Sequence, residues 1–353
     1  MALLEETIAA VEPADDQCRA RARARLEKLT MPHWAMGRLM DLARDLAAMT
    51  RSMEPPTARR AVVTMAADHG VVDEGVSKYP QEVTAQMVAN FVAGGAGINA
   101  CARVANARVI VVDMGVAQDL GELARAGSIV SERVGAGTQN IARGPAMSRE
   151  DAARSVEAGA RIAGELARDT DLIGTGEMGI GNTTPSAAVG AALTGNSPKE
   201  MTGRGTGIDD EALERKVEIV ARALEVNKPE ASDGLDVLSK VGGFEIGGIA
   251  GLILGAAAAR RPVLVDGFIS TAGALVAHAL CPAAADYMIA AHRSVERGHA
   301  LMLKHLGKEP LLTLDLRLGE GTGAALAMPL VEAAARLLTD VSTFEEAAVS
   351  ESQ

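Results

Sequence analysis

The chain has 353 residues and a formal net charge of −11, and it is 48% hydrophobic but only 2% aromatic. This acidic balance argues against a nucleic-acid or anionic membrane partner, because both need clustered Lys and Arg. The three cysteines, Cys18, Cys101 and Cys281, form no CxxC pair, so neither a disulfide framework nor a zinc site is indicated. The start of the chain lacks the basic region of a signal peptide, and the longest apolar run, Ile246–Ala259, is too short to cross a bilayer. We expect a soluble, cytoplasmic protein.

Short β-branched runs alternate with longer amphipathic stretches. The first ~55 residues carry helical patterns only and end at Glu54-Pro55-Pro56, which is typical of a linker. Six later runs that are apolar on both faces predict buried parallel strands: Ala61–Ala66, Arg108–Val112, Asp171–Gly174, Pro262–Val265, Tyr287–Ala290 and Leu311–Leu314. Apolar residues at i, i+3 and i+4 predict helices between and after them, for example Arg149–Leu166, Asp209–Leu224, Ser294–Leu306 and Gly321–Leu338.

This alternation predicts an α/β fold, doubly wound, with a mainly parallel sheet and helices on both faces. We expect residues 1–57 to form a helical segment of a small domain and residues 58–330 to form the large α/β domain. Residues 331–353 are expected to join the small domain. In such sheets ligands bind beyond the carboxyl ends of the strands, and here the polar, glycine-rich segments follow the predicted strands.

The segment Gly174–Thr183 places four glycines and Glu177 between a predicted strand and a helix. Glycines let backbone N–H groups approach an anion, and the helix N-terminus adds a favourable dipole. The spacing matches neither GxGxxG nor the P-loop, which disfavours a dinucleotide or triphosphate site. An ordinary turn with Asn182 or Thr183 as helix cap is an equally good interpretation.

Glu320 lies among Gly319, Gly321 and Gly323, after a predicted strand and at the start of a predicted helix. A carboxylate flanked by glycines and Leu318 can be partly desolvated, which raises its proton affinity toward that of a general base. Alternatively, it only stabilises the helix dipole, by a few tenths of a kcal/mol. From the residues alone the two interpretations are even.

Further polar residues are candidate phosphate ligands. Arg204 and Lys216 follow the glycine-rich segment and suggest phosphate capture, and Ser294 offers an anion site at a predicted helix start. Lys216 is equally interpretable as a solvent-facing residue paired with Glu211 or Asp210. The six histidines show neither HExxH nor HxxxH spacing, so no metal site is predicted.

Together these segments resemble the nicotinate-nucleotide:dimethylbenzimidazole phosphoribosyltransferase family. The motifs that carry the likeness include, in order, AADHGVVDEGVSKYPQEVT, GTGEMGIGNTTPSAA, TGRGTGID, VLVDGFISTAGAL, HRSVERGH and LDLRLGEGTGAALAMPLV. The resemblance implies an enzyme of cobalamin nucleotide-loop synthesis that moves the 5-phosphoribosyl group of nicotinate mononucleotide to 5,6-dimethylbenzimidazole. The products would be α-ribazole 5'-phosphate, with the anomeric centre inverted, and nicotinate. No cofactor is implied.

The resemblance also implies residue roles within the large domain. Glu320, the glutamate of LGEGTG, would be the catalytic base. The implied nucleotide-binding residues are Glu177, Gly179, Gly181, Asn182, Lys216 and Ser294, the last two near the phosphate. The implied benzimidazole-binding residues are Ser77, Gln86 and Leu318. A homodimer is implied as well, and the apolar, Gly-rich stretch Gly242–Ala258 is typical either of an interface or of a core.

Two other interpretations stay open. Val263–Gly273 is superficially like the diphosphate-sugar loop of magnesium-dependent phosphoribosyltransferases, although Gly267 stands where those enzymes present a second acid. A nucleotide-binding module without catalysis would also account for the motifs. It predicts that Glu320 can be neutralised without loss of function.

Overall fold

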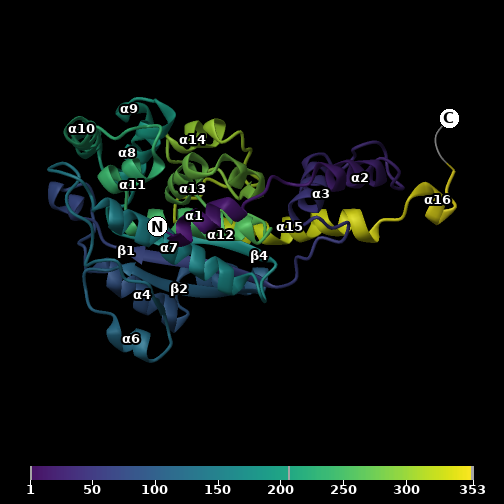
Figure 1. Cartoon of the computed structure of the whole chain (residues 1–353), viewed down its shortest axis with the longest axis horizontal. Helices are drawn as coiled ribbons and strands as arrows, with labels where there is room; N and C mark the ends of the chain where they lie inside the picture. Colours follow the sequence, from purple (N-terminus) through teal and green to yellow (C-terminus); the bar gives the residue numbers. More distant parts are fainter. Residues whose placement is uncertain (1, 206, 351–353) are drawn as a thin grey trace.

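The computed structural model describes residues 2–205 and 207–350. Within them the chain forms one six-stranded sheet in the order β3-β2-β1-β4-β5-β6, with every neighbouring pair parallel (Figure 1). The strands are β1 Arg60–Ala67, β2 Ala107–Gly115, β3 Val130–Ser131, β4 Leu172–Met178, β5 Val263–Val265 and β6 Met288–Ala290. The order reverses direction between β1 and β4, as in a doubly wound sheet, which confirms the predicted fold class.

The predicted strand Leu311–Leu314 is wrong. Leu312 forms a single parallel bridge with His292, next to β6, and no ladder follows. Asp315 then takes a left-handed conformation with φ of 55°, which turns the chain away from the sheet. No sequence pattern predicted β3, because two residues are too few to show a period.

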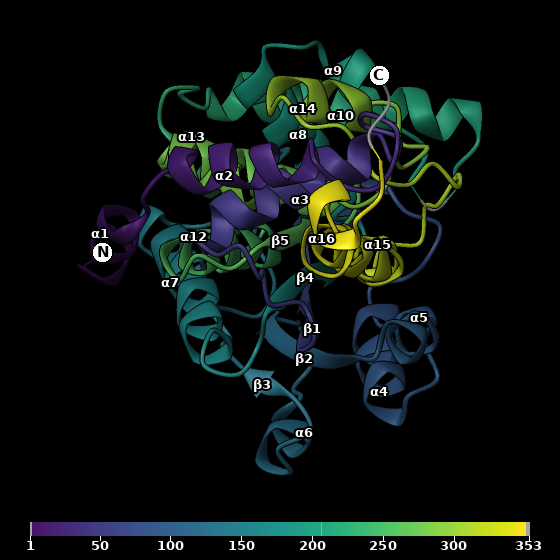
Figure 2. The ribbon, with the colours of Figure 1, turned by 90° about the vertical axis from the view of Figure 1, so that its right-hand side faces the viewer.

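Helices cover both faces of the sheet (Figure 2). Side chains alternate along β1, so that Met65 faces α12 (Phe244–Ala258) while Val62 faces the start of α15 (Thr322–Asp340). On the α12 face lies α7 (Arg149–Leu166), and beside α15 lies α5 (Gly97–Ala105).

The stretch Gly242–Ala258 is core. All residues of α12 up to Ala257 are buried in the monomer, and its Gly251 lies so close to Val156 of α7 that a Cβ would collide with the Val156 carbonyl oxygen. This stretch therefore offers no exposed surface to a second copy.

The remaining helices agree with the sequence in part. The predicted helix Arg149–Leu166 matches α7, whereas only His299–His305 of the predicted helix Ser294–Leu306 is helical, as α14. The other α-helices are α1 Ala2–Ala10, α2 Asp16–Leu26, α3 Arg38–Thr50, α4 Val83–Ala93, α6 Gly121–Arg125, α8 Thr183–Thr194, α9 Pro198–Met201, α10 Asp210–Asn227, α11 Gly234–Val241, α13 Phe268–Leu280 and α16 Phe344–Ala347, with 3₁₀ turns at η1 Gly70–Glu74 and η2 Pro282–Tyr287.

The two chain ends meet in an arm that extends beyond the sheet (Figure 1). There α2 and α3 pack on the second half of α15, and the N–H of Phe344 donates to the carbonyl of Lys28 at 2.9 Å. The guanidinium of Arg25 donates to the carbonyl of Leu338. By contrast, α1 packs on α7 and α12 beside the sheet, and residue 330 falls inside the continuous helix α15.

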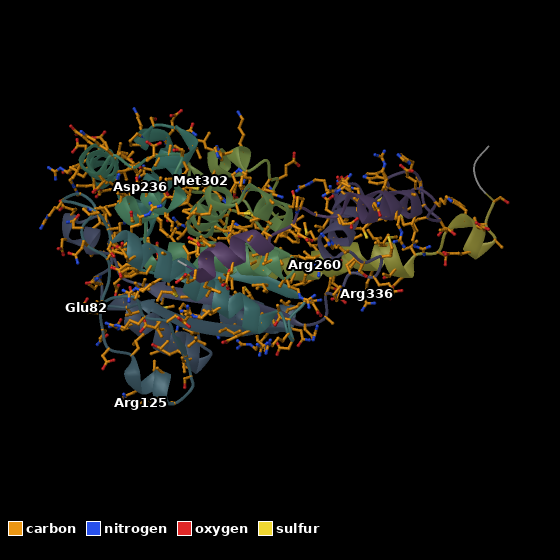
Figure 3. The ribbon with its side chains drawn as sticks, viewed as in Figure 1. Glu82, Arg125, Asp236, Arg260, Met302 and Arg336 are labelled. Atoms are coloured by element: carbon orange, nitrogen blue, oxygen red, sulfur yellow. The ribbon has the colours of Figure 1, made fainter. Side chains whose placement is uncertain are left out.

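Charged side chains of both signs are spread around the surface, for example Glu82, Arg125 and Arg336 on different sides of the molecule (Figure 3). No helix in the described part of the chain is long and apolar enough to cross a membrane.

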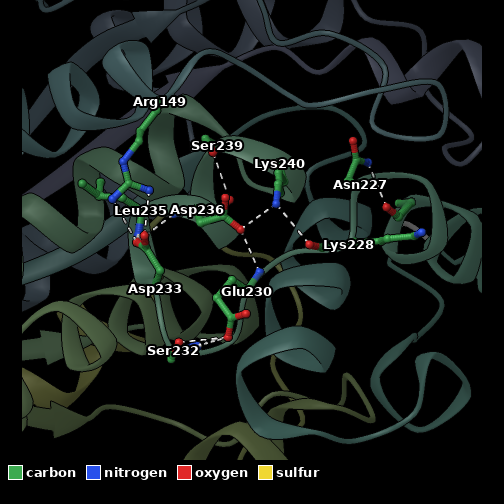
Figure 4. Close-up of polar contacts among 11 residues, drawn as sticks. Arg149, Asn227, Lys228, Glu230, Ser232, Asp233, Leu235, Asp236, Ser239 and Lys240 are labelled. Carbon is green, nitrogen blue, oxygen red and sulfur yellow. Dashed lines mark hydrogen bonds and ion pairs between the residues drawn. The ribbon is translucent and has the colours of Figure 1, made fainter.

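A polar network fixes α10, the helix that carries Lys216 (Figure 4). Just beyond its C-terminus, the Lys240 ammonium donates to the carbonyl of Lys228 and pairs with Asp236 at 2.9 Å. At the last residue of the helix, the side-chain amide of Asn227 donates to the carbonyl of Ile141 at 2.8 Å. These contacts hold α10 against α11 and the segment before α7.

Candidate active site

A cavity of about 410 Å³ opens beyond the carboxyl ends of β4 and β5, within the size range of small-molecule sites. Its polar lining includes Glu177 and Asn182 from the end of β4 and the loop that follows, Ser294 from the segment after β6, and Glu320 from the turn before α15. Its apolar lining comprises Val76, Val83, Met87, Met178, Phe268 and Leu318, among others. The location is the one at which doubly wound sheets bind ligands.

Glu320 reaches the cavity from a turn with an unusual backbone. Gly319, Glu320 and Gly321 all have positive φ, of 82°, 64° and 97°. The Glu320 residue is only 5% exposed, and its Oε2 accepts a hydrogen bond from the N–H of Ile98 at 2.9 Å. Burial raises the pKa of Glu320 above its usual range, and the negative charge of Asp266 adds to the rise.

The interpretation of Glu320 as a dipole partner of the helix that follows it is wrong. Glu320 precedes α15, and its carboxylate meets the first turn of α5 instead. Three contacts hold its backbone in place. The Thr64 hydroxyl donates to the Glu320 carbonyl at 2.9 Å, while Asp266 accepts the N–H groups of Gly321 and Ala324 at 3.3 and 3.0 Å.

Asp266 also bears on the magnesium-dependent alternative. Its carboxylate is buried, with both oxygens turned toward the backbone of the Glu320 turn rather than toward the cavity. The buried His292 ring faces it, 3.7 Å from Nε2 to Oδ1. Among residues 2–205 and 207–350 no three histidine, cysteine or carboxylate side chains gather as metal ligands.

Glu177 is a second buried carboxyl of the cavity, at the end of β4. Its Oε2 accepts from the side-chain amide of Asn182 at 2.5 Å. Burial, opposed by that hydrogen bond and helped by the charges of Asp266, Glu245 and Glu320, raises the pKa of Glu177 to about 8. The raised pKa favours the protonated form of Glu177, which can donate a hydrogen bond.

The predicted glycine loop is shorter than expected. β4 runs through Gly174 and Gly176 to Met178, so only residues 179–182 lie between strand and helix. Gly176 serves close packing, because a Cβ there would collide with the carbonyl oxygen of Glu320. Gly179 and Gly181 line the cavity, and Gly181 needs its glycine for a φ of 88°.

Lys216 lies just behind the lining at the other end of the cavity. The solvent-facing interpretation is wrong, since the side chain is 1% exposed and its Nζ donates to the Thr183 hydroxyl at 2.6 Å. Burial lowers the pKa of Lys216 to about 8, against the opposing effect of Glu296. The expected partner Asp210 pairs instead with Arg204, which does not line the cavity.

Ser294 lines the cavity but does not begin a helix, because α14 starts at His299. The predicted helix-start anion site is therefore wrong. The backbone N–H of Ser294 donates to Nδ1 of His299 at 2.9 Å. Its hydroxyl accepts from the N–H of Glu296 at 3.3 Å and keeps its own proton free to donate.

Two of the three residues expected to bind the benzimidazole lie at the cavity. Ser77 and Leu318 line the cavity, and Leu318 is 60% exposed at its edge. Gln86 is exposed on α4 and is not among the lining residues, whereas its neighbour Met87 is. Loop register could not be fixed from sequence, and the helix turns Gln86 outward.

Sequence reasoning did not assign three further residues of the site. His292 and Glu296 line the cavity, and Asp266 supports the Glu320 turn. The sequence did indicate them, because each lies in a motif that begins at or just after a buried strand: Asp266 after β5, and His292 and Glu296 after β6. Their polar side chains are buried at that edge, which is unusual unless they bind or position something.

Known proteins match the chain over nearly its whole length. The model of a family described as phosphoribosyltransferase matches residues 11–349. The chain is 62% identical over 351 residues, 99% of both proteins, to a nicotinate-nucleotide--dimethylbenzimidazole phosphoribosyltransferase of Syntrophotalea carbinolica. It is 57% identical over 351 residues, again 99% of each, to one of Desulfotalea psychrophila.

Solved structures give the same picture. The crystal structure of CobT from Thermus thermophilus superposes with a TM-score of 0.91 at 48% identity, covering 95% of this chain and all of that one. These matches span nearly the whole chain, and they place it among relatives that share one activity. The chain belongs to the nicotinate-nucleotide--dimethylbenzimidazole phosphoribosyltransferase family.

Proposed function

We propose that this protein transfers the 5-phosphoribosyl group of nicotinate mononucleotide to 5,6-dimethylbenzimidazole. One observation carries the proposal. An apolar cavity holds the carboxylate of Glu320 on one side and, on the other, a buried ammonium, that of Lys216, just behind Thr183. A flat aromatic acceptor suits the apolar walls, and a phosphate suits the end near Lys216.

The chemistry asks for a base. Nicotinate bound to ribose through its ring nitrogen is already a pyridinium, so it leaves as a neutral ring without being protonated. A benzimidazole nitrogen attacks the anomeric carbon from the opposite side, which inverts that centre. The new carbon–nitrogen bond places positive charge on the benzimidazole, and Glu320 relieves it by accepting the proton of the other ring nitrogen.

The raised pKa of Glu320 suits this role. A carboxylate with ordinary proton affinity is a poor acceptor for a benzimidazolium proton, whereas burial brings the two affinities closer. The N–H of Ile98 donates to Oε2, and we assign Oε1 the contact with the acceptor.

We assign the rest of the cavity as follows. Glu177 and Asn182, with Gly179 and Gly181, bind the nucleotide, and the protonated Glu177 donates a hydrogen bond to an oxygen of the ligand. Lys216 and the hydroxyl of Ser294 bind its phosphate. Ser77 and Leu318 bound the benzimidazole side, where Met87 takes the place expected for Gln86.

We further propose a cytoplasmic homodimer that acts in cobalamin nucleotide-loop synthesis. The free thiols of Cys18, Cys101 and Cys281 are consistent with a reducing compartment.

The arm made by α2, α3 and the end of α15 supports a small domain formed from both chain ends, although α1 lies outside it.

The test is direct. Purified protein is incubated with nicotinate mononucleotide and dimethylbenzimidazole, with and without a chelator, and products are separated by chromatography. α-Ribazole 5'-phosphate should form equally in both. Product formed only from phosphoribosyl diphosphate and magnesium would contradict the proposal.

A further inference from the structure

His299 is a fully buried histidine at the start of α14 that does not line the cavity. Its Nδ1 lies 2.9 Å from the backbone nitrogen of Ser294, and its Nε2 lies 3.0 Å from the Thr271 hydroxyl. A backbone N–H can only donate, so Nδ1 must be the acceptor and the ring proton must sit on Nε2. The geometry therefore fixes one tautomer.

The hydrogen bonds continue in a single direction. With its proton on Nε2, His299 donates to the oxygen of Thr271, and the Thr271 hydroxyl donates to the carbonyl of Gly267 at 2.7 Å. Gly267 is separated from β5 by Asp266 alone and is the N-cap residue of α13. These hydrogen bonds thus tie the backbone of Ser294 to the connection between β5 and α13.

Protonation of the ring would break this connection, because a cationic imidazole has no lone pair for the N–H of Ser294. Burial lowers the pKa of His299 to about 3, with His292 and Arg293 adding to the effect. The ring therefore stays neutral at and well below neutral pH, so it neither stores a proton nor senses pH there.

What His299 holds is the turn that closes one end of the cavity. Within that turn the Ser294 hydroxyl accepts from the N–H of Glu296, and Glu296 in turn accepts the N–H of Gly205 at 2.9 Å. Gly205 lies against the Lys216 ammonium, since a Cβ there would be 3.1 Å from Nζ. A shift of the turn that holds Ser294 and Glu296 would therefore also move Gly205, the residue that lies against the Lys216 ammonium.

We propose that His299 is a positioning residue for the donor phosphate: its single ring tautomer fixes the turn of Ser294 and Glu296 against α13, and so sets the spacing between Ser294, Gly205 and Lys216. The proposal rests on the phosphoribosyl-transfer function proposed above. It adds a residue that touches neither substrate and acts through the backbone of Ser294.

The test compares His299→Gln with His299→Asn. The amide oxygen of Asn can take the position of Nδ1 and accept from Ser294, whereas Gln places its amide near Nε2 and leaves that N–H without an acceptor. His299→Gln should raise the KM for nicotinate mononucleotide roughly tenfold, the size expected for one lost buried partner. The KM for dimethylbenzimidazole and the kcat should change by less than about threefold. His299→Asn should restore most of the nucleotide KM.

The matched control is His278→Gln, a half-buried histidine of α13 that does not line the cavity. It should leave both KM values unchanged. If His299→Gln lowers the melting temperature or kcat but keeps the wild-type nucleotide KM, His299 is only structural and the proposal is overturned.

A calorimetric titration with inorganic phosphate separates this proposal from the proposed function. If the wild type makes no α-ribazole 5'-phosphate, the proposed function fails, but weaker phosphate binding by His299→Gln than by His299→Asn would still support the positioning role. Phosphate binding that is equal in both variants, or undetectable in the wild type, would contradict it.

Discussion

Glu320 has a backbone conformation that a glutamate rarely adopts. A left-handed φ costs a non-glycine residue about 1 kcal/mol, and here the residue lies between two glycines that are left-handed as well. Two hydrogen bonds hold this backbone in place: the Thr64 hydroxyl donates to the Glu320 carbonyl, and the Asp266 carboxylate accepts from the N–H of Gly321. The strain is consistent with a residue kept for chemistry, because a glycine at the same position would fold more easily.

Glu320→Gln tests the base directly. The amide keeps the size of the side chain and an oxygen for the N–H of Ile98, but it cannot take the benzimidazole proton. Turnover should fall ~10²- to 10⁴-fold while both substrates still bind. Steady-state kinetics and calorimetry measure the two effects separately, and near-normal turnover would remove Glu320 from the role of base.

The pH profile of the wild type should carry the signature of the same group. The base acts when ionised, so kcat/KM should fall as the pH decreases through the pKa of Glu320, which lies above the ordinary glutamate value of 4.5. The remaining activity of Glu320→Gln should lack this acidic limb. An unchanged limb in the variant would assign it to another group.

Lys216 predicts how nucleotide affinity depends on pH. In the protein without ligand, the Lys216 ammonium has a pKa of about 8. A bound phosphate dianion favours the charged form of the lysine. Raising the pH above about 8 removes the charge of Lys216 in the ligand-free enzyme first, so the contribution of Lys216 should weaken the affinity toward tenfold per pH unit. Calorimetry at pH 7, 8 and 9 measures this slope.

The control for that slope is Lys216→Met, which keeps the length of the side chain without its charge. It should bind the nucleotide more weakly at pH 7. Any slope that remains in the variant belongs to Glu177, whose pKa is also about 8. Equal slopes in both proteins would show that Lys216 does not hold the phosphate.

At the scale of helices and strands, glycines decide how closely the Glu320 turn approaches the sheet. A Cβ at Gly176 would collide with the Glu320 carbonyl oxygen and lie 3.0 Å from the N–H nitrogen of Gly321. Gly176→Ala should therefore displace the turn and lower turnover by ~10²-fold, since a displacement of about 1 Å in an active site has that effect. Kinetic assays with circular dichroism measure it.

Gly164→Ala is the matched control, because Gly164 is an exposed position of α7 with no atom within 4 Å of a built Cβ. Alanine favours a helix over glycine by about 0.5–1 kcal/mol, so this variant should melt slightly higher and keep full activity. Normal turnover in Gly176→Ala would show that the turn tolerates displacement.

Periodicity in the sequence predicted most of the helices and strands, and it also indicates the burial of Lys216. Lys216 lies in register with Val220, Ala223 and Asn227, which together form the buried stripe of α10. A lysine on an apolar stripe at spacings of 4, 3 and 4 residues indicates burial, yet its charge suggested an exposed position. The motif order, by contrast, was enough to bring Glu177 and Glu320 to one cavity.

Other features depended on contacts that no local pattern reveals. Ser294 precedes an apolar, helical-looking stretch, but His299 takes its backbone N–H, and the helix begins only after Gly298. The sequence pattern also did not predict the end of β4, because Gly174 and Gly176 are typical of loops. They lie in a strand here because α15 and its preceding turn pack against them.

At the scale of the whole molecule, the strand order explains where the cavity lies. Chain connections leave β1 toward β2 in one direction and reach β4 in the other, so the loops at their carboxyl ends diverge and leave a crevice. Glu177 is the penultimate residue of β4, and the Glu320 turn packs against the same strand end. One topological feature thus brings together carboxyls that lie far apart in sequence.

The arm at the opposite end of the molecule bears on the last prediction, that the protein is a homodimer. The buried helix α12 cannot supply the interface, so exposed apolar residues must. The connection between α2 and α3 leaves Met36 45% exposed beside the only tryptophan, Trp34. Stable interfaces place such side chains at their centre, where a buried charge is costly.

Light scattering should give twice the chain mass of 36.4 kDa for the wild type. Met36→Asp should shift the mass toward the monomer, and Trp34 fluorescence should report the change. A monomeric wild type would refute the dimer, whereas a fully dimeric Met36→Asp would place the interface elsewhere than on this connection.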